Sequence, residues 1–259
     1  MTAPRQRLLL STAPILGLLI IWQIISASNL VNQNLFPPPS EILKALWSLI
    51  KSGTLIHDMF QSLWRWCFGL IIGSFIGLVI GLLTGRIPLW NYLLSPIIQL
   101  IRPLPPVALI PVMIVWFGID NDAKIIAIAL AVFFPMWVST HIGAEQIPKA
   151  YIDSATFLTK SRLKLFTKVI FPATLPFSVA GFRNSNAIAF IMVFVSELAG
   201  ASSGLGYRIS ISELTYRMDQ MLAALLVLGL LGMITDQIII YATRTIFPWL
   251  QSSRTITHY

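Results

Sequence analysis

The sequence predicts an all-α membrane protein that crosses the bilayer about six times. Of its 259 residues, 56% are hydrophobic and only 11% are charged, and the mean hydropathy is +0.78. These values are typical of a polytopic membrane protein and not of a soluble domain. The apolar residues also gather in long runs, and the basic residues concentrate between two of these runs. We expect one transmembrane domain that covers residues 1–259.

Six runs are predicted to span the membrane, at residues 8–28, 62–84, 93–117, 123–140, 176–199 and 221–246. The first run could instead be a signal peptide, because Ser26, Ala27 and Ser28 resemble a cleavage site. Its length exceeds the roughly 7 to 15 residues of a signal core, which favours an uncleaved span. With both termini in the cytoplasm, most Lys and Arg residues fall inside, as the positive-inside rule requires.

The second run carries a glycine at every fourth position near its centre and end. These glycines are Gly69, Gly73, Gly77, Gly81 and Gly85. Residues at this spacing share one face of a helix, and such a strip lets another helix approach backbone to backbone. We expect close packing at this strip, either within the subunit or against a second copy.

The third run is interrupted by prolines and contains an arginine. The prolines are Pro96, Pro103, Pro105, Pro106 and Pro111. They predict a broken helix, because each proline lacks the N–H that a helical carbonyl needs. Arg102 lies in the broken region, and an arginine inside a bilayer costs at least ~2.5 to 3.5 kcal/mol unless it faces a cavity or a partner. Arg102 is therefore a candidate pathway residue, although a structural role is slightly favoured over contact with an anion.

The fifth run is unusually polar for a membrane span. It contains Asn184, Asn186, Ser196 and Glu197. Polar residues within a span either bond neighbouring helices together or line a pathway, and for Asn184 and Asn186, which lie on different faces, both roles stay open. We take these four residues, with Arg102, as candidates for lining a translocation pathway.

The segment between the fourth and fifth runs, residues 141–175, must lie in water. It gathers the basic residues Lys149, Lys160, Arg162, Lys164 and Lys168. Apolar residues recur among them at helical spacing, and prolines stand where helices begin or stop. Short amphipathic helices in a water-facing loop predict an apolar face that docks into another protein.

This loop resembles the cytoplasmic coupling loop of permease subunits of binding-protein-dependent ABC importers, which carries Glu-Ala-Ala, then Gly, then Ile-x-Leu-Pro. The matching positions are Asp153, Ser154 and Ala155, then Thr159, then Val169, Ile170, Phe171 and Pro172. Thr159 departs most from the pattern, because glycine supplies a turn geometry that a β-branched residue tolerates poorly. Three further segments, Arg102–Ile119, Leu175–Arg183 and Ser196–Ile209, resemble the nitrate, sulfonate and taurine branch. The resemblance covers nearly the whole chain.

The resemblance implies a type I importer permease fold with a cytoplasmic coupling helix that docks onto an ATPase. The docking residues would be Asp153, Ser154, Ala155, Thr156, Phe157, Leu158 and Thr159. It implies two cytoplasmic ABC ATPase subunits, a second copy of the permease, and a periplasmic or lipid-anchored substrate-binding protein, all at the bacterial inner membrane. The solute would be a small anion such as a sulfonate, taurine, nitrate or bicarbonate. A pyrimidine related to thiamine precursors is the alternative within the family.

Sequence motifs for catalysis are absent from this chain. It has no GxxxxGK[ST] phosphate loop, so ATP and Mg are expected in partner subunits and no cofactor here. His57, His141 and His258 are scattered and Cys67 is the single cysteine, so neither a metal site nor a disulfide is predicted. The charge of +8 is spread between apolar runs, which argues against nucleic acid. An ion-gradient-driven secondary transporter remains the rival function, although such proteins usually have more spans.

Overall fold

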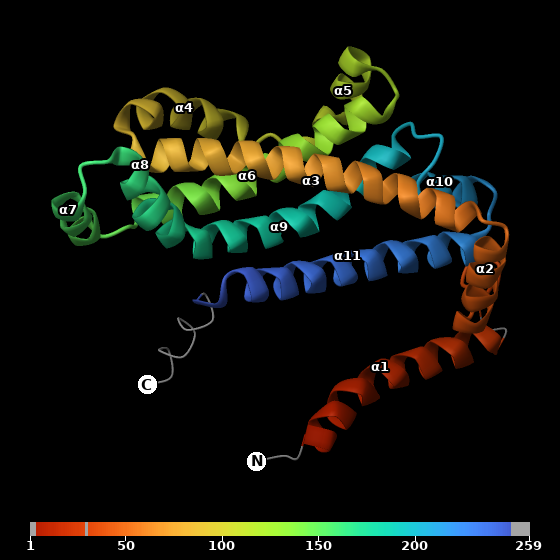
Figure 1. The fold of residues 1–259 in the computed structure, drawn as a ribbon. Helices are drawn as coiled ribbons and strands as arrows, with labels where there is room; N and C mark the ends of the chain where they lie inside the picture. The colour runs from red at the N-terminus through yellow and green to blue at the C-terminus, as the bar shows by residue number, and fades with distance from the viewer. Residues whose placement is uncertain (1–3, 29–30, 250–259) are drawn as a thin grey trace. The chain divides into compact units, whose positions relative to one another are not determined.

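The computed structural model describes residues 4–28 and 31–249, and it describes side chains from residue 13 onward within these ranges. The described residues form helices joined by short turns, with no β-strand among them, which confirms the predicted all-α fold (Figure 1). The chain divides into two compact units, residues 1–61 with 202–228 and residues 62–201 with 229–259. Two long helices, α3 (Thr54–Arg86) and α11 (Met218–Ile246), contribute residues to both units.

The first unit contains α1 (Pro4–Ala27), α2 (Pro39–Lys51), α10 (Leu205–Leu214) and the first turns of α3 and α11. A tight connection joins α1 to α2: the Ser26 hydroxyl donates to the Phe36 carbonyl, and the Gln23 side chain pairs with Ser40. Asp58 of α3 fixes the start of α10, because its carboxylate accepts hydrogen bonds from the Gly204 amide and from the Arg208 guanidinium.

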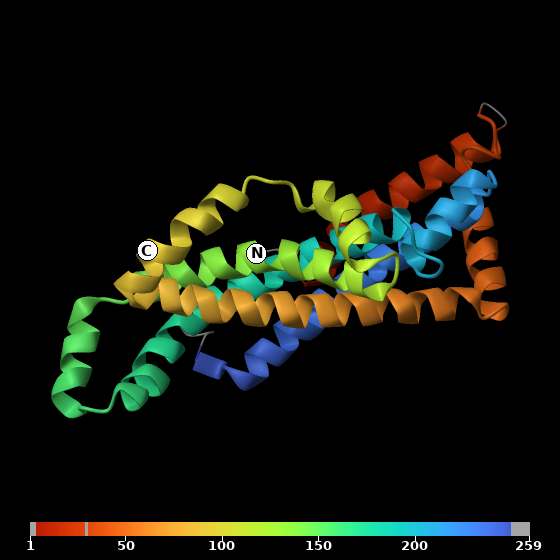
Figure 2. The ribbon, with the colours of Figure 1, turned by 90° about the horizontal axis from the view of Figure 1, so that it is seen from above.

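The second unit is organised around α6 (Asn121–Glu145). Ile128 and Val132 of α6 are completely buried and lie in the main apolar core. The part of α3 in this unit and α9 (Phe171–Leu198) both run alongside α6 (Figures 1 and 2). The remaining elements of this unit are α4 (Pro88–Ile101), η1 (Pro106–Leu109), α5 (Ile110–Phe117), α7 (Lys149–Leu158), α8 (Arg162–Leu165), the π-helical turn η2 (Phe166–Ile170) and the last turns of α11.

The glycine strip of α3 lies against α6 of the same subunit. A Cβ atom at Gly73 would lie 2.3 Å from the Ala129 carbonyl oxygen. The other four glycines of the strip leave equally little room, with 2.5 to 2.8 Å to the nearest α6 atom. Gly143 and Gly181 let α6 and α9 approach equally closely. α6 thus packs along two seams, one with each neighbouring helix, that only small residues permit.

The third predicted span is a bent pair of helices, as its prolines indicate. α4 and the η1–α5 segment meet at 84° across a break of four residues. Arg102 follows the last residue of α4, inside this break, and its side chain is exposed. α5 ends at Phe117 and is followed by Gly118, whose φ of 85° is a left-handed conformation that favours glycine.

Four described helices are long and apolar enough to cross a membrane, and the bent pair counts as a fifth if it forms one span. The four contain the predicted spans 62–84, 123–140 and 221–246, and all of 176–199 except its last residue, Ala199. In α1, the stretch Ala13–Ala27 is a shorter apolar helix. The start of the first predicted span, residues 8–12, lies outside the described side chains, so the count of six spans stays a prediction.

The predicted loop 141–175 is shorter in the structure, because helices extend into it from both sides. α6 continues to Glu145, and α9 begins at Phe171. Pro172 does not stop the helix, since it stands in the first turn of α9, where its missing N–H is tolerated. The segment that remains, residues 146–170, carries the three short elements α7, α8 and η2.

Candidate functional site

The water-facing loop is dominated by α7, which follows Pro148, ends at Leu158 and is capped by Thr159. Thr159 is extended, with φ −150° and ψ 135°, and its amide donates to the Ala155 carbonyl at 3.0 Å. The Thr159 hydroxyl then accepts from the Ser161 amide at 3.2 Å, and Ser161 caps α8. A β-branched residue adopts this extended conformation without strain. The turn therefore does not need the glycine that the family pattern has there.

α7 buries none of its residues against the rest of the chain. Phe157 and Leu158 are 91% and 88% exposed, and in Figures 1 and 2 the helix stands beyond the ends of α6 and α9. Leu163 of α8, in the same loop, is also exposed. Lipid cannot cover these apolar side chains, because Lys160, Arg162 and other basic residues of the same loop require water. An apolar patch of this kind in water marks a surface for another protein.

The predicted docking residues form a mixed surface. Asp153, Ser154 and Thr156 are exposed, while Ala155 and Thr159 are half-buried. The Thr156 hydroxyl donates to the Asp153 carbonyl at 2.7 Å. The structure thus gathers all seven predicted positions on one exposed helix and its final turn.

The base of this loop is bonded to α3. The Thr84 hydroxyl lies 2.9 Å from His141 Nδ1 and accepts from the Trp137 indole at 3.1 Å. The Trp137 and His141 rings stack, with 5.4 Å between their centroids. Arg86 donates to the Ala144 carbonyl at 3.2 Å. These contacts connect the end of α6, from which the loop leaves, to the end of α3.

Glu197, a predicted pathway residue, lies in a sealed ion pair with Arg65 of α3. The Arg65 Nη1 donates to the carboxylate at 2.6 Å, and the Ser62 hydroxyl lies 2.9 Å from both carboxylate oxygens. Arg65 Nε also donates to Asn121 at the start of α6. Sequence reasoning missed Arg65, although a lone charge in an apolar helix signals that a partner exists.

The other predicted pathway residues differ in their surroundings. Asn186 is buried, accepts from the Trp66 indole at 3.0 Å and donates to the Thr235 hydroxyl at 3.4 Å. Ser196 is buried and donates to the Val193 carbonyl. Asn184 and Arg102 are exposed. The structure therefore brings Asn186 into contact with helices α3 and α11 and does not bring the five residues together. Their role in transport stays a prediction.

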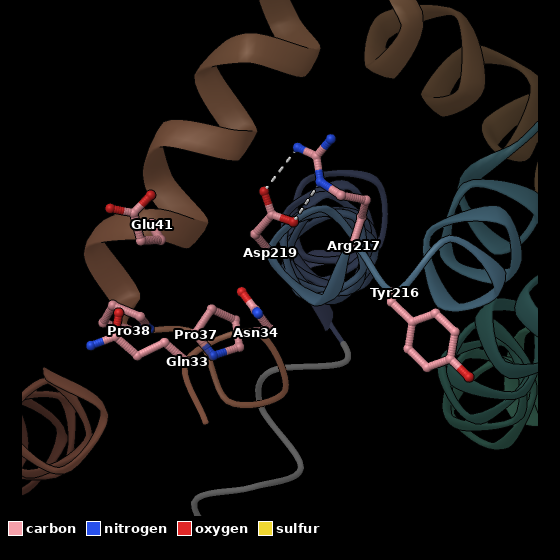
Figure 3. A pocket seen from close by; sticks show the side chains of 8 residues that line it. All are labelled: Gln33, Asn34, Pro37, Pro38, Glu41, Tyr216, Arg217 and Asp219. Atoms are coloured by element: carbon pink, nitrogen blue, oxygen red, sulfur yellow. Dashed lines mark hydrogen bonds and ion pairs between the residues drawn. The ribbon is translucent and has the colours of Figure 1, made fainter. Parts of the chain in front are cut away.

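The first unit contains a polar pocket of about 300 Å³. Its lining residues are Gln33, Asn34, Pro37, Pro38, Glu41, Tyr216, Arg217 and Asp219. Figure 3 shows Arg217 and Asp219 facing each other in a two-pronged pair, with both bonds 3.2 Å long. The Asp219 hydrogen bond raises the pKa of Arg217 above its ordinary value. Among the described residues, no group of three or more His, Cys, Asp or Glu side chains could hold a metal ion.

Comparison with known sequences identifies the family. The sequence model of the family described as binding-protein-dependent transport system inner membrane component matches residues 69–246. The chain belongs to this family. It is thus a permease subunit of an ABC importer, a class of membrane transport subunits that is typically not catalytic.

The permease has relatives that are similar over almost their whole length. A Bacillus subtilis protein named as the aliphatic sulfonates transport permease SsuC is 32% identical over 235 residues, which are 91% of this chain and 85% of the relative. The SsuC protein of Escherichia coli is 33% identical and covers 91% of both chains. The taurine transport system permease TauC of Escherichia coli is 29% identical over 93% of this chain and 89% of its own.

Two solved structures share the fold. An amino acid ABC transporter has a TM-score of 0.59 at 16% identity, covering 78% of this permease and 96% of that chain. The inward-facing MetNI methionine ABC transporter has a TM-score of 0.58 at 21% identity, covering 79% and 96%. Both confirm the predicted type I importer fold.

Proposed function

We propose that this permease moves a small anion, such as a sulfonate, taurine, nitrate or bicarbonate, into the cytoplasm, and that ATP hydrolysis in partner subunits drives the movement. Two ATPase subunits would hold ATP and Mg²⁺ and dock on α7 and on the same helix of a second permease copy. A periplasmic or lipid-anchored binding protein would deliver the solute. Both termini would face the cytoplasm.

The exposed apolar end of α7 carries this proposal. Phe157 and Leu158 lie in a basic loop that lipid does not reach. No other described element covers them. The loop is also bonded to α3 through Thr84 and His141. A groove on an ATPase that accepts these side chains would gain apolar burial and would transmit its movement to the spans.

The relatives support the choice of solute. The proteins with 29% to 33% identity named above carry names that refer to aliphatic sulfonates and taurine. A sulfonate presents three equivalent oxygens and a permanent negative charge, so a pathway that selects it needs well-placed cationic donors.

The docking step is tested by Phe157→Asp. The variant places a charge in the patch, and we expect loss of co-purification with the ATPase subunits and loss of ATP-driven uptake. Lys160→Gln is the matched control, because Lys160 lies in the same loop beyond the end of α7 and its side chain is exposed. Full co-purification and uptake by Phe157→Asp would contradict the proposal.

The energy source and the solute are tested in proteoliposomes that contain the complete transporter. We expect uptake of labelled taurine or an alkanesulfonate to require ATP, the ATPase subunits and the binding protein. Uptake by this chain alone under an ion gradient would instead support a secondary transporter. ATP-driven uptake of a pyrimidine with no uptake of anions would overturn the solute class and leave the docking step standing.

A further inference from the structure

An ion pair that is open to its surroundings joins α9 to α11 within the second unit. Arg183 Nε donates to one carboxylate oxygen of Asp236 at 3.2 Å, and Arg183 Nη2 donates to the other at 3.1 Å. This is the parallel two-bond geometry that arginine forms with carboxylates and other oxyanions.

The pair lies at membrane depth. Arg183 is 12 residues from the start of α9 at Phe171 and 15 from its end at Leu198, distances of about 18 and 22 Å along a helix. Asp236 is 10 residues from the end of α11 at Ile246, or about 15 Å. Both helices are long and apolar enough to cross a membrane. The pair therefore stands inside the spanning region and not at a surface.

Exposure distinguishes this pair from the sealed one. The side chains of Arg65 and Glu197 are 3% and 0% exposed, as expected of a pair that only fastens helices. Those of Arg183 and Asp236 are 38% and 33% exposed. Lipid does not solvate charged groups, so a half-open pair at this depth must face a water-filled cavity or another protein.

The surroundings of the pair favour a cavity. Asn184, next to Arg183, and Gln237, next to Asp236, are also exposed and polar. Polar side chains at this level thus lie on both helices that carry the pair.

Arg183 has N–H groups that do not donate to Asp236. Its guanidinium carries five N–H groups, and two of them donate to Asp236. No further hydrogen bond of Arg183 is found among the described residues. The remaining edge of the guanidinium can bind two oxygens of a small oxyanion while Asp236 holds the other edge.

We propose that Arg183 binds the anion during its passage and that Asp236 is the resident counter-ion that keeps this binding weak enough for release. The inference rests on the proposed import of an anion and names the residue that would contact it. Weak binding is a requirement of conduction, because a solute that is held tightly does not leave.

The test is a set of neutral variants in the complete transporter, measured as ATP-driven uptake of labelled taurine. Asp236→Asn keeps the cation and removes its counter-ion, so we expect the anion to be held more tightly, with a lower half-saturating taurine concentration and a slower maximal uptake. Arg183→Gln and the double variant Arg183→Gln/Asp236→Asn remove the anion contact, and we expect at least about a tenfold loss in both. The double variant Glu41→Gln/Lys44→Gln is the control, because it neutralises an exposed pair in α2.

The double variant distinguishes binding of the anion by Arg183 from a purely structural role of the ion pair in joining α9 to α11. If the pair only fastens α9 to α11, removing both charges restores compatibility and uptake recovers, which would overturn the inference while the proposed function stands. Wild-type transporter that imports no anion would overturn the proposed solute and the anion contact together. Binding-protein-stimulated ATPase activity shows whether each variant assembles.

A second measurement does not depend on the charged pair. Asn184→Cys, in a chain with Cys67→Ala, keeps both charges and places a thiol beside Arg183. We expect it to react with a negatively charged, membrane-impermeant thiol reagent in membrane vesicles, and we expect substrate to slow the reaction. Absence of reaction in an assembled transporter would overturn the inference, because it would show that no aqueous path reaches this level.

Discussion

Replacing Gly73 of α3 by alanine should destabilise the permease, although alanine is the better helix former. The added Cβ would lie 2.3 Å from the Ala129 carbonyl oxygen and 2.9 Å from two further backbone atoms of Ala129. Ordinary contact begins at 3.4 Å, which leaves a shortfall of 1.1 Å. Because all three atoms belong to the backbone, no change of rotamer relieves the clash, and α3 and α6 must separate.

The size of the effect follows from two opposing terms. Overpacking costs about 1–3 kcal/mol, and a clash with three backbone atoms belongs to the upper part of this range, about 2–3 kcal/mol. Alanine returns ~1 kcal/mol through its higher helix propensity. We expect a net loss of about 1–2 kcal/mol in the free energy of unfolding. At about 2–4 °C per kcal/mol for a chain of this size, the melting temperature should fall by about 2–8 °C.

The assay is a thermal ramp of the detergent-purified protein followed by size-exclusion chromatography of a fluorescent fusion. Gly229→Ala in α11 is the matched control, because the same methyl group there meets no atom within 4 Å. We expect the control to be as stable as the wild type or slightly more stable. A Gly73→Ala protein that melts no lower than Gly229→Ala would refute the close-packed seam.

Three further predictions concern the buried polar contacts and the topology. Glu197→Gln leaves Arg65 charged and buried without its partner, so it should lower the free energy of unfolding by about 3–5 kcal/mol. Glu41→Gln neutralises an exposed carboxylate and should change the melting temperature little. Equal melting temperatures for the two variants would contradict this. Asp58→Ala should speed hydrogen exchange in the first turn of α10, because two hydrogen bonds to the Asp58 carboxylate hold this turn; unchanged exchange would count against that role. A cysteine at Lys160 should react with an impermeant reagent only after cells are permeabilised, and reaction in intact cells would reverse the orientation.

Regular features of the sequence predicted the regular features of the fold. The spacing of Gly69 to Gly85 indicated a close helix contact, and the prolines after Pro96 indicated a bent third span. The partner of the glycine strip was left open between another helix of the same subunit and a second copy, because periodicity shows which face is small and not what lies against it. The structure places α6 there.

Charge pairs could not be predicted in this way. Arg65 and Glu197 are separated by 132 positions, and Arg208 and Asp58 by 150. No local pattern links residues so far apart, and a single sequence offers no covariation. Thr159 illustrates a different limit. Its departure from the family pattern suggested a strained turn, yet the chain leaves α7 in an extended conformation that threonine adopts easily.

The two tight seams on α6 have a mechanical consequence for the second unit. Each small residue sits in a notch opposite a specific neighbour, such as Gly73 opposite Ala129 and Gly181 opposite Ser139. If one helix slid along another, larger side chains would clash at these notches, so the helices cannot slide past each other gradually. If the loop moved, α3, α6 and α9 would therefore move together as one rigid group. Bending would then be confined to places without such close packing, such as the break at Arg102 between α4 and η1.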